Sequence, residues 1–391
     1  MLVKYVTQMA FFQFIIAIFI WFFLFFILER YLKSKYYLNY SSVKFFIIYY
    51  ILLSIFAILR IFWNILPDTS DSFFFLSIAE EIERGDNIKI FGPYVYSSFI
   101  YVIKILTFNN YYTILFVNIF IFIIALVDLM SIIPQSNRNR YWIWFGFLLI
   151  YPSIYWFVPN VVREAIFIFC IVNILCQSIN IIHKNITIKY VCLLIFYCSI
   201  TVILRPQTLP ILFIWLLFLS CRRNFKYGIL VVVVGLLFLN TNYVQQEIIQ
   251  KVSFGYLEAY KTEASSSVPQ IAFKELIIPS GLKELFTLSP YLIFRFLFSP
   301  YPWELSNLQY TFAFTDALLV AILFLVLGWM AMKGLIWNWD IVFFSFLFIT
   351  IMGVFEIAFT GAVRHRMPYI LILSSFLLNI QFKMLLNELA E

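Results

Sequence analysis

Charged residues are scarce in this chain of 391 residues, since Asp, Glu, Lys and Arg together make up only 12% of it. Soluble domains carry about 25% charged residues, so a soluble domain of ordinary size is excluded. Hydrophobic residues account for 63% of the chain, and the mean hydropathy is +0.94. Apolar runs of about 20 residues, the length of a bilayer-spanning helix, recur throughout. They predict an all-α, polytopic integral membrane protein with a single membrane domain over residues 1–391.

Patterns for metal binding, disulfides and nucleic acid are also missing. The five cysteines lie in or beside apolar runs, at spacings that fit neither a zinc site nor a disulfide framework. No HxxH or DxD pattern occurs, and no soluble segment interleaves basic with aromatic residues. We therefore expect no metal, no cofactor and no nucleic-acid partner. The first apolar run, 11–28, has no small-residue cleavage site and is expected to be a retained span.

Basic residues cluster between the apolar runs and account for much of the net charge of +7. Under the positive-inside rule such clusters mark cytoplasmic loops. The clusters are Arg30, Lys33, Lys35 and Lys44; Arg138 and Arg140; Lys184 and Lys189; Arg222, Arg223 and Lys226; Lys333; and Lys383. This assignment places the N-terminus outside and predicts about 11–12 transmembrane helices. The better-defined spans are 10–29, 45–66, 141–158, 164–182, 190–204, 208–221, 227–240, 309–332, 341–360 and 368–384.

Two longer segments then fall outside: a first loop at 67–93 with an interfacial helix, and a large external, periplasmic loop at 241–308. Short external turns are expected at 159–163, 205–207 and 361–367.

The stretch 94–133 is ambiguous, because it is broken at Asn109 and Asn110. Residues 94–108 either cross the membrane or form a re-entrant or interfacial helix. We favour the second interpretation, since re-entrant backbone is tolerated where protein or a wet cavity covers it.

Arginines gather on the predicted external face. They are Arg163, Arg205, Arg364 and Arg366 in the turns, Arg295 in the large loop, and Arg60 near the external end of a span; the acids Glu164 and Glu356 accompany them. Guanidinium groups match phosphate oxygens, although an arginine at a span end often only reaches toward lipid headgroups. The set predicts an anionic ligand at the membrane surface, most simply a lipid-linked phosphate or pyrophosphate.

The segment TGAVRHRMP, 360–368, places one of only two histidines between two arginines. Like charge on both sides should lower the pKa of His365, and a neutral imidazole is what a general base at neutral pH requires. His365 is therefore the first candidate for the catalytic base, with a polar turn residue as the plain alternative.

A second candidate lies in LPDTSDSFFFLSIAEEIERGD, 66–86. Asp68 and Asp71 precede an amphipathic run suited to a helix on the membrane surface. Either carboxylate could serve as a general base or bind a divalent metal, or Asp71 could simply cap the helix.

A third segment, LSPYLIFRFLFSPYPWEL at 288–305, combines helix-breaking prolines with many aromatic residues. Arg295 and Trp303 belong to it. Its aromatic side chains suit an interfacial lid, either anchored at headgroup depth or stacked on sugar rings.

Together these features resemble the membrane glycosyltransferases of the bacterial cell envelope that use polyprenyl-linked sugars, and most closely the O-antigen (oligosaccharide repeat-unit) polymerases of the Wzy type. The resemblance lies in the length, the spans rich in Phe, Ile and Tyr, the single large external loop and the scattered external arginines. It implies polymerisation of undecaprenyl-pyrophosphate-linked oligosaccharide at the periplasmic face of the inner membrane, in O-antigen or other surface polysaccharide synthesis. A chain-length regulator protein and membrane lipid would be the partners. Arg163, Arg205, Arg364 and Arg366 would hold the pyrophosphate, and His365 would stand near the acceptor hydroxyl.

Two alternatives stay open. The first loop, with Asp68 and Asp71, also resembles that of GT-C glycosyltransferases, which add a single sugar from a polyprenyl-monophosphate donor. The N-terminus of those enzymes lies inside the cell, however, whereas the N-terminus of this chain is predicted outside. A flippase or transporter for the same lipid would also gather arginines around a cavity, but it would usually show inverted repeats, and none is visible here.

Overall fold

The computed structural model describes residues 10–35, 38–63, 70–85, 93–107, 110–134, 141–183, 187–223, 282–305, 308–356 and 359–379. All regular structure in these residues is helical, as the sequence predicts. Five of the described helices are long and apolar enough to cross a membrane: Gln13–Ser34, Tyr40–Arg60, Tyr112–Ser131, Glu164–His183 and Leu308–Met332. The predicted span 227–240 and the part of the large loop at 241–281 lie outside the described residues.

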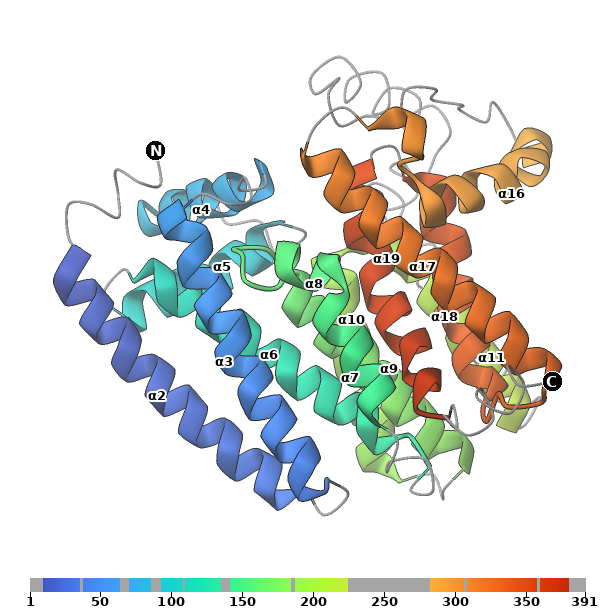
Figure 1. Ribbon diagram of the computed structural model, residues 1–391, viewed down its shortest axis with the longest axis horizontal. Coiled ribbons are helices and arrows are strands. Elements are labelled where there is room, and N and C mark those ends of the chain that lie inside the picture. Colours follow the sequence, from blue (N-terminus) through green and yellow to red (C-terminus); the bar gives the residue numbers. More distant parts are fainter. Residues whose placement is uncertain are drawn as a thin grey trace, which may run out of the picture. The chain divides into compact units, whose positions relative to one another are not determined.

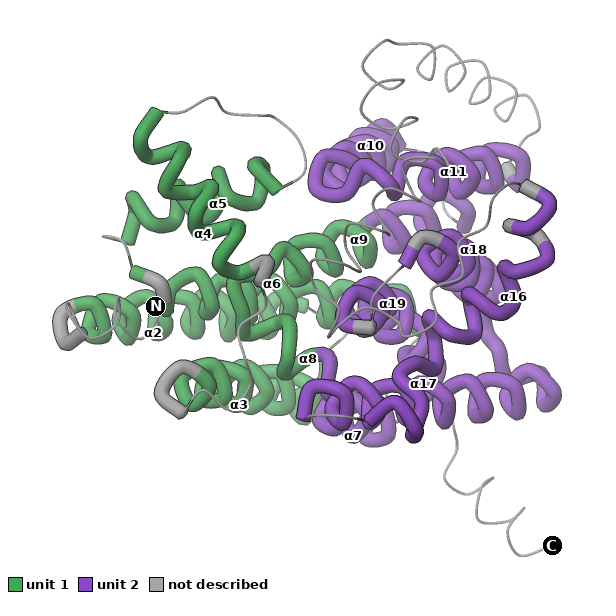
Figure 2. The backbone as a smooth tube through the Cα atoms, turned by 90° about the horizontal axis from the view of Figure 1, so that it is seen from above, with its two compact units in different colours: residues 1–141, 154–173 green, residues 142–153, 174–391 purple. Residues whose placement is uncertain are grey.

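The chain forms two compact units (Figure 2): residues 1–141 with 154–173, and residues 142–153 with 174–391. Unit 1 holds α2 (Ala10–Ser34), α3 (Tyr40–Trp63), α4 (Ser70–Glu83), α5 (Pro93–Leu106), α6 (Tyr111–Ser131) and parts of α8 (Pro152–Phe157) and α9 (Glu164–His183). Unit 2 holds nearly all of α7 (Tyr141–Ile150), the end of α9, and α10 (Ile188–Leu204), η2 (Pro206–Thr208), α11 (Leu209–Arg223), α16 (Leu282–Phe298), η4 (Pro302–Glu304), α17 (Leu308–Met332), α18 (Trp339–Phe355), α19 (Phe359–Ser374) and η5 (Ser375–Asn379).

In unit 1, α2 and α6 run parallel. At their starts the Asn110 side-chain amide donates to the carbonyl of Gln13, and at their ends the Tyr31 hydroxyl donates to Asp128 over 2.7 Å. The helix α3 runs back in the direction opposite to α2 (Figure 1), so the end of α3 and the start of α6 lie at the same end of the unit. The two helices that connect α3 to α6 in the chain, α4 and α5, pack against each other (Figure 1). Each has 14 residues, or about 21 Å of helix, which is short for a bilayer core of about 30 Å. This length favours the alternative in which residues 94–108 form a re-entrant or interfacial helix, and that alternative stays a prediction.

In unit 2, α16 lies closely against α18. A Cβ atom added at Gly353 would stand 3.2 Å from the Cα atom of Ile293 and 3.2 Å from the Cβ atom of Phe296, so the two helices approach as closely as a glycine allows. Pro290 lies inside α16, which corrects the expectation that it breaks the helix. The burial of Leu292, Phe296 and Leu297 explains why the helix persists.

Two further expectations need correction. The predicted turn 361–367 is helical, because α19 runs from Phe359 to Ser374 with Pro368 inside it. Its residues Val363, Met367 and Ile370 are fully buried, so packing outweighs the hydrogen bond that the proline removes. The predicted span 141–158 is divided at Tyr151, with α7 before it and α8 after it.

Candidate functional site

The centre of the candidate site is a hydrogen-bonded pair on α19 and the end of α18. His365 Nδ1 lies 2.5 Å from Glu356 Oε2. The side chains are 15% and 8% exposed, respectively. A ring nitrogen this close to a carboxylate carries the proton and donates it, which leaves the lone pair on Nε2. The Nε2 atom is buried and has no hydrogen-bond partner among the described residues. The pair therefore has the geometry of a general base oriented by a carboxylate.

Glu356 is held where two helices meet. It is the C-cap of α18, and its backbone N–H donates to Met352 O over 3.0 Å. Its carboxylate lies directly on Gly361 in the first turns of α19: a Cβ atom there would be 2.2 Å from Oε1 and 2.7 Å from Cδ. Only glycine leaves this space free.

Two arginines act on the imidazole of His365, which lies outside the five candidate spans. Burial lowers the pKa of His365 to about 4; the charges of Arg205 and, more weakly, Arg364 act in the same direction, and Glu356 opposes them. The direction agrees with the sequence-based expectation. The cause differs from the expected charge of the two neighbouring arginines. Burial contributes most, Arg205 comes from the turn between α10 and η2, and Arg366 is not among the groups that shift this pKa.

Arg205 is fully buried, and its backbone is fixed by the turn that it begins. The carbonyl of Arg205 accepts hydrogen bonds from the N–H of Thr208 over 2.9 Å and from its hydroxyl over 2.7 Å. The Arg205 charge also acts on the hydroxyl of Tyr369, one helical turn after His365. That hydroxyl is buried without a hydrogen-bond partner among the described residues. We call Arg205, Glu356, Arg364, His365 and Tyr369 the His365 cluster.

Arg366 belongs to a different arrangement. Its Nε and Nη2 atoms donate to Asp316 Oδ2 over 3.0 and 2.7 Å, and Nη1 donates to the carbonyls of Phe296 and Leu297 over 2.7 and 2.8 Å and to that of Ser299 over 3.3 Å. Both charged side chains are fully buried, and Asp316 also accepts a hydrogen bond from Ser153. We call Arg366, Asp316 and these carbonyls the Arg366 cluster. Arg366 therefore joins α16, α17 and α19, and we leave it out of the pyrophosphate-binding set.

Arg295 also has partners within the protein. Its Nη1 donates to the hydroxyl of Tyr291 over 3.2 Å, and its Nη2 lies 3.7 Å from Glu304 Oε1. Glu304 in turn accepts from the N–H of Tyr301 over 2.8 Å. Trp303 is 77% exposed and stacks on Tyr301 with ring centroids 5.0 Å apart. The end of α16 is thus buried and paired, while Trp303 is exposed in η4.

The remaining arginine candidates lie in unit 1. Arg60 Nη1 donates to the carbonyl of Trp156 over 2.7 Å, at the C-terminal end of α8. The guanidinium carbon of Arg163 lies 5.8 Å from the ring centroid of Phe75, which brings the turn before α9 next to α4. Because Arg163 and the His365 cluster belong to different units, their convergence on one ligand stays a prediction.

The acidic candidates of unit 1 are only partly described. Glu164 is buried at the first residue of α9, where a helix N-terminus favours negative charge. Asp68 and the side chain of Asp71 lie outside the described residues. Among the residues that are described, no three His, Cys, Asp or Glu side chains gather as a metal site would require.

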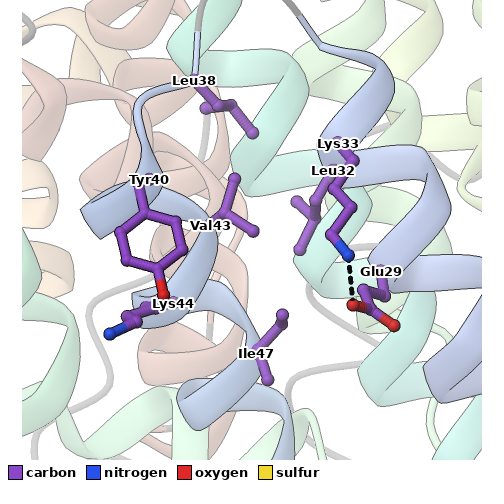
Figure 3. A pocket seen from close by; sticks show the side chains of 8 residues that line it. All are labelled: Glu29, Leu32, Lys33, Leu38, Tyr40, Val43, Lys44 and Ile47. Carbon is purple, nitrogen blue, oxygen red and sulfur yellow. Dashed lines mark hydrogen bonds and ion pairs between the residues drawn. The ribbon is translucent and has the colours of Figure 1, made fainter.

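A groove of about 450 Å³ lies between the end of α2 and the start of α3 (Figure 3). Its two lysines already have partners, since Lys33 Nζ lies 2.6 Å from Glu29 and Lys44 Nζ lies 4.4 Å from the ring centroid of Tyr40. This basic end of the helix pair matches a predicted cytoplasmic cluster, and we assign it no ligand.

Three residues of these two clusters do not follow from the sequence-based candidates. Glu356 is among the predicted external charges, but nothing in the sequence pairs it with His365 except Gly361 between them, which allows a close approach. Tyr369 stands four residues after His365, the spacing of one helix face. Asp316 is the only charged residue in the apolar run 309–332, and such residues usually face a partner inside the protein.

Comparisons with protein-family models, with curated proteins and with solved structures gave no match for this chain.

Proposed function

We propose that this protein is a multi-pass membrane glycosyltransferase that polymerises undecaprenyl-pyrophosphate-linked oligosaccharide repeat units at the periplasmic face of the bacterial inner membrane, in the synthesis of O-antigen or another surface polysaccharide. The proposal includes about 11–12 transmembrane helices. Five described helices with the required length and hydropathy support its membrane part. The observation that carries its catalytic part is the pair of His365 and Glu356, with an Nε2 atom that has no partner in the described residues, next to two arginines.

The proposed reaction uses three members of the His365 cluster directly: His365, Arg205 and Arg364. His365 Nε2 takes the proton of the acceptor hydroxyl as its oxygen forms a bond with the anomeric carbon of the donor sugar. The bond from that carbon to the lipid pyrophosphate breaks, and the electron pair leaves with the pyrophosphate oxygen. Arg205 and Arg364 stabilise the growing negative charge, which contributes most in the transition state. Arg163 lies in the other unit, and its part in binding the pyrophosphate stays a prediction.

Purified protein incubated with a lipid-linked repeat unit tests the proposal. A ladder of longer lipid-linked products is expected from the wild type and from His183→Ala, which removes the only other histidine, an exposed one. His365→Ala should give no ladder. A reaction that yields only unit-length lipid and no covalent product would contradict the proposal and favour transport of the lipid-linked sugar.

One observation favours a second candidate, a GT-C glycosyltransferase. Arg163 lies beside Phe75 of α4, the helix that follows Asp68 and contains Asp71. A carboxylate base and a phosphate-binding arginine could therefore meet in unit 1. This function predicts a single added sugar from a polyprenyl-monophosphate donor and its loss in Asp68→Asn or Asp71→Asn.

A further inference from the structure

We propose that Glu356 is the positioning residue for His365, and that Gly361 is the residue that admits its carboxylate. The inference rests on the proposed role of His365 as base and goes beyond it, because it states how the base is prepared. Glu356 does not touch the reacting atoms in this scheme. It acts through the imidazole.

The position of the carboxylate is fixed from two sides. Glu356 ends α18, and its N–H bond to Met352 O holds the backbone at that point. The carboxylate then lies on the first turns of α19, at Gly361, where unsatisfied N–H groups and the helix dipole favour negative charge. The same carboxylate reaches His365 Nδ1, four residues further along α19. Glu356 makes other contacts as well, so the test must isolate the contact with His365.

The consequence for the imidazole follows from the hydrogen bond. Donation from Nδ1–H to Glu356 selects the tautomer with a free lone pair on Nε2 and fixes the plane of the ring. When Nε2 takes the acceptor proton, the imidazolium still donates from Nδ1 to the carboxylate. Glu356 therefore stabilises the positive ring without taking a proton itself.

Gly361 supplies an independent observation. The glycine is in a helix, where alanine is usually preferred, and yet any Cβ would overlap the Glu356 carboxylate. Gly361→Ala should therefore displace the carboxylate without breaking the helix. Gly328→Ala is the matched control, because Gly328 lies in α17 with nothing within 4 Å of the added carbon.

A mutant cycle on these two residues measures the coupling. Gly361→Ala and Glu356→Ala should each lower kcat at least about tenfold with little change in KM, since an oriented base contributes about 10²–10⁴-fold. In the Glu356→Ala background, Gly361→Ala should have no further effect, because the overlapping group is gone. Effects that multiply in the double variant would overturn the proposal. Asp340→Asn, which removes another buried carboxylate of α18, controls for general damage.

A spectroscopic readout makes the test independent of the reaction. His183→Ala leaves His365 as the only histidine in the untagged chain, so ¹⁵N-histidine NMR reports its tautomer directly. We expect the Nδ1–H form in the parent protein, and a mixture with the Nε2–H form in Gly361→Ala and Glu356→Ala. An unchanged spectrum in both variants would overturn the inference. Failure of the wild type to form a product ladder would instead overturn the proposed function, whatever the spectrum shows.

Discussion

His365 and Arg366 are neighbours on α19, but the polar groups of the two clusters to which they belong are paired in different ways. In the Arg366 cluster both charged groups are fully buried, and the guanidinium bonds to a carboxylate and three carbonyls. In the His365 cluster the pair is slightly exposed, and an imidazole nitrogen and a tyrosine hydroxyl have no partner among the described residues. A buried charge whose partners lie within the protein holds helices together, whereas a buried polar group without such a partner can bind or react.

The strongest test of this contrast is to remove the carboxylate of the Arg366 cluster. Asp316→Asn leaves a buried guanidinium without a compensating charge, which costs about 3–5 kcal/mol. We expect a large loss of folded protein, seen as reduced thermal stability in detergent and reduced yield in membranes. Asp340→Asn should have a smaller effect, because its partner Arg222 is half exposed. Equal stability losses in the two variants would contradict the structural role of the Arg366 cluster.

The next effect concerns catalysis rather than folding. His365→Ala should lower turnover about 10²-fold or more, because removing a general base costs that much. His365→Gln should be nearly as poor, since glutamine keeps a hydrogen bond but takes no proton. The measurement is the chain-length distribution in a deletion strain complemented at matched protein level. Near-normal ladders from both variants would transfer the base role to Asp68, Asp71 or Glu164.

The limits of two of the predicted spans could be read from the sequence, because they depend on local residues. Residues 164–182 and 309–332 match α9 and α17 to within one residue, since charges, Asn or turn residues flank each apolar run. The helix through 361–367 was not predictable, because the bonds of Arg366 come from residues 50 to 70 positions earlier in the chain.

The candidate site was predictable only in part. A histidine between two arginines could be recognised as unusual, but nothing in the triplet says which arginine faces a ligand. The contact between Glu356 and His365 spans the break between α18 and α19, so it depends on the angle at which two helices meet. Neither helical periodicity nor spacing supplies that angle.

A smaller effect is expected at Arg364. Lysine keeps the charge but loses the planar fork that binds phosphate oxygens in pairs. We therefore expect Arg364→Lys to raise KM or lower kcat about tenfold, on the order of one lost charge-assisted hydrogen bond, with unchanged thermal stability. If Arg364→Lys destabilises the protein as Asp316→Asn does, Arg364 belongs with the structural charges.

The pH dependence of the reaction tests whether His365 acts as a buried imidazole with a lowered pKa. Because the pKa of His365 is lowered to about 4, the basic form persists well below the ordinary value of about 6.5. The kcat/KM of the wild type should stay level from pH 7 to about pH 5 and fall as the pH passes through about 4. Stability should also fall between about pH 6.5 and 4, since there the unfolded chain binds a proton that the folded chain does not. An acid limb near pH 6.5 would contradict the buried setting of the imidazole.

The smallest expected effect is that of metal removal, which distinguishes a catalytic site in unit 2 from one in unit 1. In the proposed mechanism guanidinium groups supply the positive charge that balances the leaving pyrophosphate, and Arg205 and Arg364 already act on His365. Excess EDTA should therefore leave ladder formation nearly unchanged, with manganese or magnesium adding nothing. A collapse that either metal restores would mean that carboxylates bind a cation essential to the reaction. Asp68 and Asp71 are the sequence-based candidates for that role, so such a result would favour the GT-C mechanism, with its base in the first loop, over a base on α19.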